Sequence, residues 1–298
     1  MFETSGNKNF VNRAHVGEHA KIEFEIYVSD HGEETIEGIE SSIHYMKTGS
    51  GEPLILVHGV GQSLYTFRNM LEELGKHFTV YAIDLPGHGY SDRPTISYNV
   101  EEVALCIEAF MNTAGLASAH FCTFGESAAY VLDFVQHNQE RARNLMFISP
   151  LMTSAGGRRQ PPFPFVSISS RLFLTQQSFY NDLLYLYFDR TLLTPEVLEE
   201  TFLPYGDKEF RQILKLYAAN YSDREIAEKM LEIQNHVLVI RGADDKISPY
   251  LQEGIAGFPV RDLKTYTIRN CNYLVQEEKA DKAILAIIEF CSLYKDQI

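Results

Sequence analysis

The sequence has no histidine after His236, so a catalytic imidazole cannot come from the C-terminal segment that follows it. It also lacks a basic excess, because 40 acidic residues against 26 basic ones leave a net charge of −14. Nucleic acids and anionic membranes bind basic patches, so both are disfavoured as partners. We expect a small-molecule substrate, and the sequence does not indicate an oligomeric state.

The chain also lacks the patterns of metal, cofactor and membrane proteins. Its four cysteines show no paired metal-ligand spacing, which predicts free thiols in a reducing compartment and no metal site: Cys106, Cys122, Cys271 and Cys291. No glycine-rich dinucleotide fingerprint or P-loop is present, so no cofactor is expected. No apolar run approaches the ~18 residues needed to span a bilayer. The first residues do not resemble a signal peptide, and we expect a cytoplasmic protein.

Short apolar strands alternate with amphipathic helices along most of the 298 residues. This alternation predicts an α/β fold with a mostly parallel eight-stranded sheet, covered by helices on both faces. The expected strands are residues 22–28, 42–47, 53–57, 79–83, 120–124, 145–149, 237–241 and 263–268, with the first two antiparallel. The expected helices are residues 63–76, 99–115, 127–137 and 279–293.

Between residues 151 and 233 the alternation stops and helical segments follow one another. We predict a helical cap over residues 151–233, inserted into a core formed by residues 1–150 and 234–298. Thr194-Pro195 resembles an N-cap followed by proline at the first helical position, and residues 222–225 form a capping-box pattern. The cap is rich in aromatic residues, which suits packing on the core and also suits an apolar substrate chamber.

The segment Gly125-Glu126-Ser127-Ala128-Ala129 lies between an expected strand and an expected helix. A strand-to-helix turn that presents a serine hydroxyl needs small flanking residues, which Gly125 and Ala129 provide. The helix N-terminus would favour negative charge developing next to Ser127. Ser127 is therefore the predicted nucleophile.

Three further segments make the chain resemble the α/β-hydrolase fold-1 family: residues 56–63, with His58-Gly59, residues 84–91, and residues 242–249. The resemblance implies an α/β-hydrolase fold with an oxyanion hole formed by the N–H groups of Val60 and Ala128. It implies that Asp245 is the triad acid. His58 and Glu126 would lie at the substrate site, with His58 supporting its loop.

The last segment departs from the family pattern. Where the family usually has Gly-His, this sequence has Asn272-Tyr273. A tyrosine with a pKa near ~10 is a poor base at neutral pH. Removing a triad histidine typically costs about 10⁶ in kcat. Fast ester hydrolysis is therefore not expected.

These residues leave three functional hypotheses open. The first, which the serine, the acid and the oxyanion loop favour, is a diverged hydrolase-family enzyme with Ser127, Asp245 and Tyr273 as its catalytic residues. It would act on a small, largely apolar ester, thioester or related carbonyl compound. The second is a non-catalytic ligand-binding or interaction protein on the same scaffold. The third is lyase or cyclase chemistry in which Tyr273 donates a hydrogen bond to a carbonyl or enolate. A hydrolase that recruits His58 or a substrate group as its base is a variant of the first.

Overall fold

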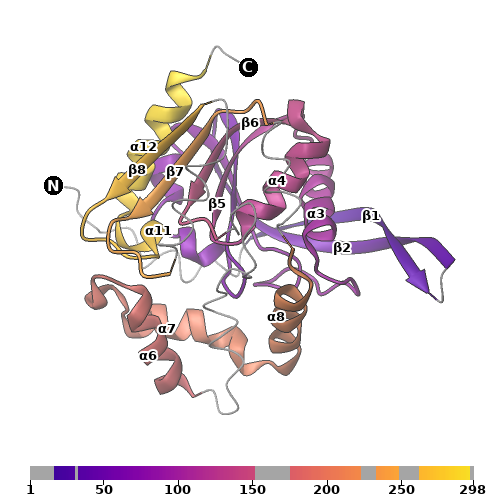
Figure 1. Cartoon of the computed structure of the whole chain (residues 1–298), viewed down its shortest axis with the longest axis horizontal. Helices are drawn as coiled ribbons and strands as arrows, with labels where there is room; N and C mark the ends of the chain where they lie inside the picture. The colour runs from indigo at the N-terminus through magenta and orange to yellow at the C-terminus, as the bar shows by residue number, and fades with distance from the viewer. Residues whose placement is uncertain (1–16, 31–32, 152–174, 223–232, 248–261, 296–298) are drawn as a thin grey trace.

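The computed structural model describes residues 17–30, 33–151, 175–222, 233–247 and 262–295. Its centre is one eight-stranded sheet with the order β1-β2-β4-β3-β5-β6-β7-β8 (Figure 1). The strands are β1 (Glu18–Asp30), β2 (Glu33–Gly49), β3 (Glu52–Val57), β4 (Phe78–Ile83), β5 (Ala119–Phe124), β6 (Ala142–Ile148), β7 (Val237–Gly242) and β8 (Leu263–Ile268).

Six of the eight strands run parallel, and β1 and β2 form the antiparallel start of the sheet. This confirms the predicted sheet, although β1 and β2 are longer than expected and extend beyond it as a hairpin (Figure 1). Every residue of β5 is buried, as a strand covered on both faces requires.

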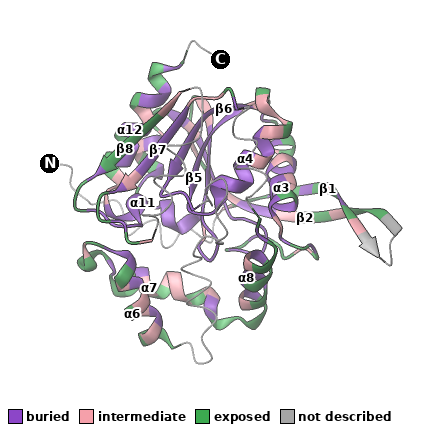
Figure 2. Ribbon diagram, viewed as in Figure 1, coloured by how far each residue is buried: buried purple, intermediate pink, exposed green. Residues whose placement is uncertain are grey.

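Helices α3 (Val100–Thr113) and α4 (Ser127–His137) lie together on one face of the sheet, and α2 (Leu71–Leu74) and α12 (Ala280–Leu293) on the other (Figure 1). The helix expected over residues 63–76 is divided into the short helix η2 (Leu64–Phe67) and α2. Figure 2 shows the buried residues concentrated in the strands and on the inner sides of these helices.

The described part of the predicted cap, residues 175–222, is helical. It contains α6 (Gln176–Leu186), η4 (Arg190–Leu192), α7 (Pro195–Phe202), η5 (Leu203–Gly206) and α8 (Lys208–Asn220). Thr194 caps α7 with its side chain and Pro195 occupies the first turn, as the sequence predicted. The expected capping box at residues 222–225 extends outside the described residues.

Hydrogen bonds and ion pairs join these helices to the core. Tyr205 Oη donates to Gly61 O and Tyr217 Oη donates to Pro86 O, both at 2.8 Å. Glu277, in the short helix α11 (Val275–Glu278), accepts a bond from Tyr187 Oη at 2.6 Å and pairs with Arg68 at 2.7 Å. These contacts hold α6 to α8 near the carboxyl ends of the parallel strands (Figure 1).

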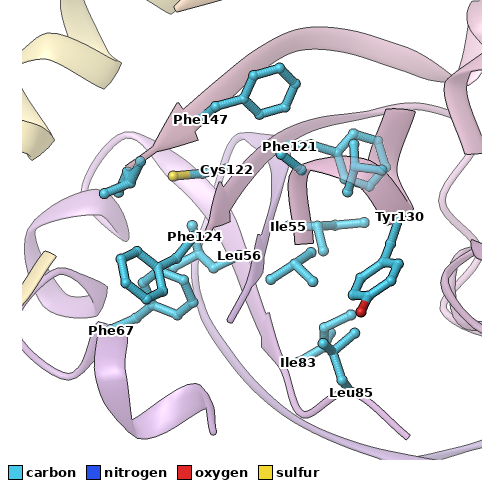
Figure 3. Close-up of a cluster of buried hydrophobic side chains, with 14 of the residues drawn as sticks. Ile55, Leu56, Phe67, Ile83, Leu85, Phe121, Cys122, Phe124, Tyr130 and Phe147 are labelled. Carbon is cyan, nitrogen blue, oxygen red and sulfur yellow. The ribbon is translucent and has the colours of Figure 1, made fainter. Parts of the chain in front are cut away.

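The core beneath this edge is a continuous apolar cluster drawn in Figure 3. Phe124 lies at the end of β5, and the hydroxyl of Tyr130 points toward Ile83 and Leu85 (Figure 3). The side chains of this cluster are almost completely buried. The residues that follow β3 and β5 therefore stand on a rigid support.

Candidate functional site

The segments predicted to carry chemistry all follow the carboxyl ends of parallel strands. The His58-Gly59 loop follows β3, the turn at Gly125 follows β5, Asp245 follows β7 and Tyr273 follows β8. Strands β3 and β5 are hydrogen-bonded neighbours, as are β7 and β8. In an open α/β sheet this edge is the usual location of ligand sites.

The strand-to-helix turn has its tip at Gly125. Gly125 has a φ of +63°, whereas Glu126 has a φ of −67° and Ser127 already begins α4. A positive φ is readily adopted by glycine and strained for other residues. The tip of the turn is therefore Gly125, two residues before Ser127. The motif placed the tip at Ser127, and the structure corrects that position.

The Ser127 hydroxyl closes the turn from inside the protein. Its Oγ lies 2.9 Å from Val57 O and 2.8 Å from Phe124 O, and it accepts a hydrogen bond from the Phe124 N–H at 3.2 Å. The side chain is fully buried. Ser127 therefore links α4 to the ends of β3 and β5, and the described residues supply no imidazole to it.

Tyr273 points its hydroxyl at the tip of the turn. A Cβ added to Gly125 would lie 2.7 Å from Tyr273 Oη, closer than real Cβ contacts occur. The tyrosine ring packs on Phe124 with a centroid separation of 4.8 Å, and the residue is fully buried. Among the described residues, Tyr273 Oη has no hydrogen-bond partner. The structure therefore brings Tyr273 to Gly125, where a side chain at the tip would stand.

The carboxyl group of Glu126 is bonded to the Val60 N–H, one of the two groups predicted to form an oxyanion hole. Glu126 Oε2 accepts a hydrogen bond from the Val60 N–H at 3.3 Å and is also bonded to the N–H of Glu126 itself. The predicted pair was Val60 with Ala128, but Ala128 lies inside α4. The amide that converges with Val60 is that of Glu126, because Glu126 directly follows the tip of the turn.

Burial controls the protonation of the Glu126 carboxyl. Desolvation raises its pKa to about 8, and the bonds from the two backbone N–H groups lower the pKa only in part. Burial therefore favours the protonated form of this carboxyl. Its second oxygen, Oε1, has no partner among the described residues.

The pKa of Tyr273 is raised well above its ordinary value. Burial is the largest cause, and the negative charges of Glu126 and Asp245 add to it. The phenol therefore remains protonated at physiological pH. It can donate a hydrogen bond, but it cannot accept a proton as a histidine base would.

The loop that carries Val60 is held by two buried histidines. His58 donates from Nδ1 to Gly59 O at 2.8 Å and accepts at Nε2 from the Leu85 N–H at 3.0 Å. His88 accepts from the Gly61 N–H at 3.0 Å, with its other nitrogen on Pro86 O. These partners assign neutral tautomers, and burial lowers the pKa of both rings. Both ring nitrogens of His58 are therefore used in the hydrogen bonds that hold the loop.

Asp245 and Asn272 stand beside Tyr273. Asp245 is almost fully buried, and its Oδ1 accepts a bond from the Ile247 N–H at 2.8 Å. Asn272 accepts from the Lys246 N–H at 3.0 Å and donates from Nδ2 to Tyr185 O, in α6, at 2.8 Å. This asparagine connects the segment after β8 to the loop of Asp245 and to the cap.

Sequence reasoning missed the role of Gly125 at the tip and the pairing of Glu126 with Val60. A signal was present, because Thr123, Gly125 and Ser127 also satisfy a small-x-tip-x-small pattern, with glycine at its centre. The two patterns differ by two residues. The prediction from the sequence used the pattern centred on Ser127.

Within the described residues, none of the helices combines the length and the apolar character of a membrane-spanning segment. No cluster of three or more histidine, cysteine, aspartate or glutamate side chains within the described ranges has the arrangement of a metal site.

The fold and the arrangement of these loops agree with the comparison to known families. The model of the alpha/beta hydrolase fold family matches residues 52–280. The chain belongs to the alpha/beta hydrolase fold family. This confirms the fold and the family resemblance predicted from the motifs.

Individual relatives are hydrolases. The chain is 26% identical over 264 residues to the 2-hydroxy-6-oxo-6-phenylhexa-2,4-dienoate hydrolase of Comamonas testosteroni, covering 83% of this chain and 90% of the relative. It is 27% identical over 180 residues to a haloalkane dehalogenase of Agrobacterium fabrum, and that alignment spans 58% of this chain and 59% of the dehalogenase. A solved meta-cleavage product hydrolase of Pseudomonas fluorescens IP01 has a TM-score of 0.73 at 20% identity, covering 85% and 95% of the two chains.

Proposed function

We propose that this family member binds a small, largely apolar, carbonyl-containing ligand at the carboxyl edge of its sheet without hydrolysing it through a serine acyl-enzyme. One observation carries the proposal. The tip of the strand-to-helix turn is Gly125, which has no nucleophilic side chain, and Tyr273 Oη lies where such a side chain would stand.

The state of Ser127 supports this proposal. A serine nucleophile needs a hydroxyl that reaches the substrate and a base that takes its proton. The Ser127 hydroxyl lies against two backbone carbonyl oxygens in the interior. Serving as nucleophile would require it to leave both bonds and a fully buried position.

Occupation of the oxyanion hole is a second supporting feature. Catalysis of acyl transfer requires two N–H donors that are free to bond the developing oxyanion. Here the N–H groups of Val60 and Glu126 are already bonded to the Glu126 carboxyl. A substrate carbonyl would have to displace this internal group before it could be activated.

The polar atoms left unpaired favour a ligand with an oxygen acceptor. Glu126 Oε1 and Tyr273 Oη are buried and have no partner among the described residues, which is rare for polar groups in a folded protein. A protonated carboxyl and a phenol both donate hydrogen bonds, so a carbonyl oxygen matches them. The name of the Comamonas testosteroni relative describes a substrate with an oxo group and a carboxylate, which is compatible with this ligand class.

A second candidate is proton-transfer chemistry of the lyase or cyclase type. It is favoured by the same carboxyl, because a general acid–base group works best when its pKa is near the operating pH. Burial raises the pKa of Glu126 to about 8, and Tyr273 could bond the carbonyl of a substrate as an enolate forms. In this mechanism Glu126 moves the proton and Tyr273 supports the negative oxygen.

The proposal is tested with the intact chain, a fluorophosphonate probe and p-nitrophenyl butyrate. We expect no labelling of Ser127 on the time scale of an active serine hydrolase, and equal ester turnover in the wild type and Ser127→Ala. Rapid labelling that disappears in Ser127→Ala would overturn the proposal. Deuterium uptake from D2O at the α-carbon of a carbonyl probe, lost in Glu126→Gln, would instead favour the second candidate.

A further inference from the structure

The Glu126 carboxyl is the group that the chain itself supplies to the two amides. We propose that the N–H groups of Val60 and Glu126 form a binding site for one carboxyl group, which the Glu126 side chain occupies as an internal ligand. A small carboxylic acid binds there when that side chain is removed. This inference rests on the proposed function, because the two amides can hold a carboxyl group only if they are not used to bind the oxyanion of an acyl-transfer reaction.

The direction of the Val60 N–H is set by its surroundings and not by Glu126. His58 bonds Gly59 O and the Leu85 N–H, and His88 bonds the Gly61 N–H on the far side of Val60. From the cap, Tyr205 Oη donates to Gly61 O at 2.8 Å. Both neighbours of Val60 are therefore fixed, so its N–H keeps its orientation when the carboxyl is taken away.

The second amide is equally fixed by the fold. Glu126 is the N-cap residue of α4, an eleven-residue helix, and its carbonyl accepts the Ala129 N–H at 3.0 Å. Ser127 joins the start of this helix to Val57 O, at the end of β3. The N-terminus of a helix favours a negatively charged or strongly polar acceptor. The two amides thus converge on an oxygen independently of the side chain that now supplies it.

The space around the carboxyl matches a group of that size. A Cβ added to Gly59 would lie 3.1 Å from Glu126 Oε2 and 3.1 Å from Phe124 Cδ1, tighter than most real contacts. Glycine at position 59 therefore leaves room for the carboxyl oxygen and little more. Removing the Glu126 side chain opens a slot with two donors, an apolar wall at Phe124 and the Tyr273 hydroxyl nearby.

The titratable groups around the carboxyl do not compete with it near pH 8. Burial, and to a smaller extent the charge of Glu126, raise the pKa of Tyr130, Tyr205 and Tyr273 well above the ordinary tyrosine value, so they stay protonated. Burial keeps His58 and His88, in the adjoining loops, neutral. A titration seen in this region near pH 8 therefore reports Glu126.

The test compares thermal unfolding of Glu126→Ala, Glu126→Gln, the exposed-site control Glu101→Ala and the wild type. Each is measured with sodium acetate, sodium formate, acetamide and sodium chloride at matched ionic strength. We expect acetate and formate to stabilise Glu126→Ala saturably, by about 2–3 °C at ten times Kd for a chain of this size. Glu126→Gln should not respond, because its amide oxygen still fills the hole. The wild type and Glu101→Ala should not respond either.

Equal acetate effects in Glu126→Ala and Glu126→Gln, or none in folded Glu126→Ala, would overturn the proposal. If Glu126→Ala does not fold, the wild type and Glu126→Gln decide it by NMR. The Val60 amide resonance should shift with pH around 8 in the wild type and stay unchanged in Glu126→Gln. A Val60 resonance that ignores pH in the wild type would also overturn the proposal. Neither result depends on labelling of Ser127, so failure here is distinct from failure of the proposed function.

Discussion

Two loops at the same edge of the sheet differ in how completely their polar groups are paired. In the loop after β4, Asp84 accepts bonds from the Leu64 N–H at 2.7 Å, the Tyr90 N–H at 3.1 Å and His44 at 2.7 Å. Around the turn after β5, Glu126 Oε1 and Tyr273 Oη are equally buried but have no partner among the described residues.

We interpret the paired loop as structural and the turn at Gly125 as the proposed ligand site. Folding alone selects full pairing of buried polar groups, because each unpaired group costs about 1–3 kcal/mol. The Asp84 loop follows that rule. Other buried atoms of the described residues, such as Tyr130 Oη and Asn144 Oδ1, are also unpaired, and what distinguishes Glu126 Oε1 and Tyr273 Oη is their place beside Gly125. Both loops carry family motifs, so the motifs alone do not reveal this contrast.

The largest expected effect is a gain of ester hydrolysis when the turn after β5 is given the groups of a serine hydrolase. Combining Gly125→Ser with Tyr273→His and Glu126→Ala would place a nucleophile at the tip, an imidazole beside Asp245 and an empty hole between them. We expect hydrolysis of p-nitrophenyl butyrate to rise by about 10²–10⁴ over the wild type, the usual contribution of a positioned general base.

The matched control for this gain is Tyr273→His with Glu126→Ala, in which Ser127 is the available serine. It should remain at the wild-type rate. A gain in this control that vanishes on adding Ser127→Ala would mean that Ser127 is the nucleophile after all. The introduced serine also adopts a positive φ, which costs of the order of 1–2 kcal/mol in stability.

Mutations in the fully paired loop of Asp84 should lower the free energy of unfolding more than mutations at the turn after β5. Asp84→Ala leaves three donors without their acceptor, two of them buried, and we expect the free energy of unfolding to fall by about 3–5 kcal/mol. Urea unfolding measures the change. The neighbouring exposed residue provides the control, and Asp92→Ala should shift stability by at most about 0.5 kcal/mol. Similar values for both variants would contradict the structural role of Asp84.

The pH dependence of stability should identify the buried Glu126 carboxyl. Folding raises its pKa from an ordinary 4.5 to about 8, so the protonated form is favoured in the folded protein. Its contribution is fully present below about pH 4.5 and is lost as pH rises through 8. One pKa unit corresponds to about 1.4 kcal/mol, so a loss of several kcal/mol is expected.

This loss is read from the difference in unfolding free energy between the wild type and Glu126→Gln at pH 5, 7 and 9. Glutamine cannot titrate, so the wild type should become less stable relative to this variant as pH increases. A difference that is constant across this range would show that Glu126 titrates normally.

The smallest expected effect compares two fully buried tyrosines. Tyr217 donates to Pro86 O, so Tyr217→Phe should cost about 1–1.5 kcal/mol. Tyr273 Oη has no partner among the described residues, so Tyr273→Phe should change stability by no more than about 0.5 kcal/mol or increase it. Calorimetry of the two variants provides the comparison. A larger loss in Tyr273→Phe would mean that its hydroxyl is bonded in solution.

The sequence predicted the eight strands, their mostly parallel arrangement and the helices on both faces, because burial on two sides forces apolar runs with a visible period. It did not locate the tip of the turn after β5. Gly-x-Ser-x-Ala and Thr-x-Gly-x-Ser overlap there, and composition cannot distinguish two patterns shifted by two residues.

The strands, the loops and the lack of a histidine near Tyr273 were thus determined by the sequence itself, since local periodicity and residue identity suffice for them. Tertiary structure alone decided that Gly125 takes the positive φ and that Ser127 turns inward. It alone joined Glu126 to Val60, which lies 66 residues earlier in the chain. Such contacts depend on how separate strands pair and how closely their loops approach, and that geometry exists only once the sheet has formed.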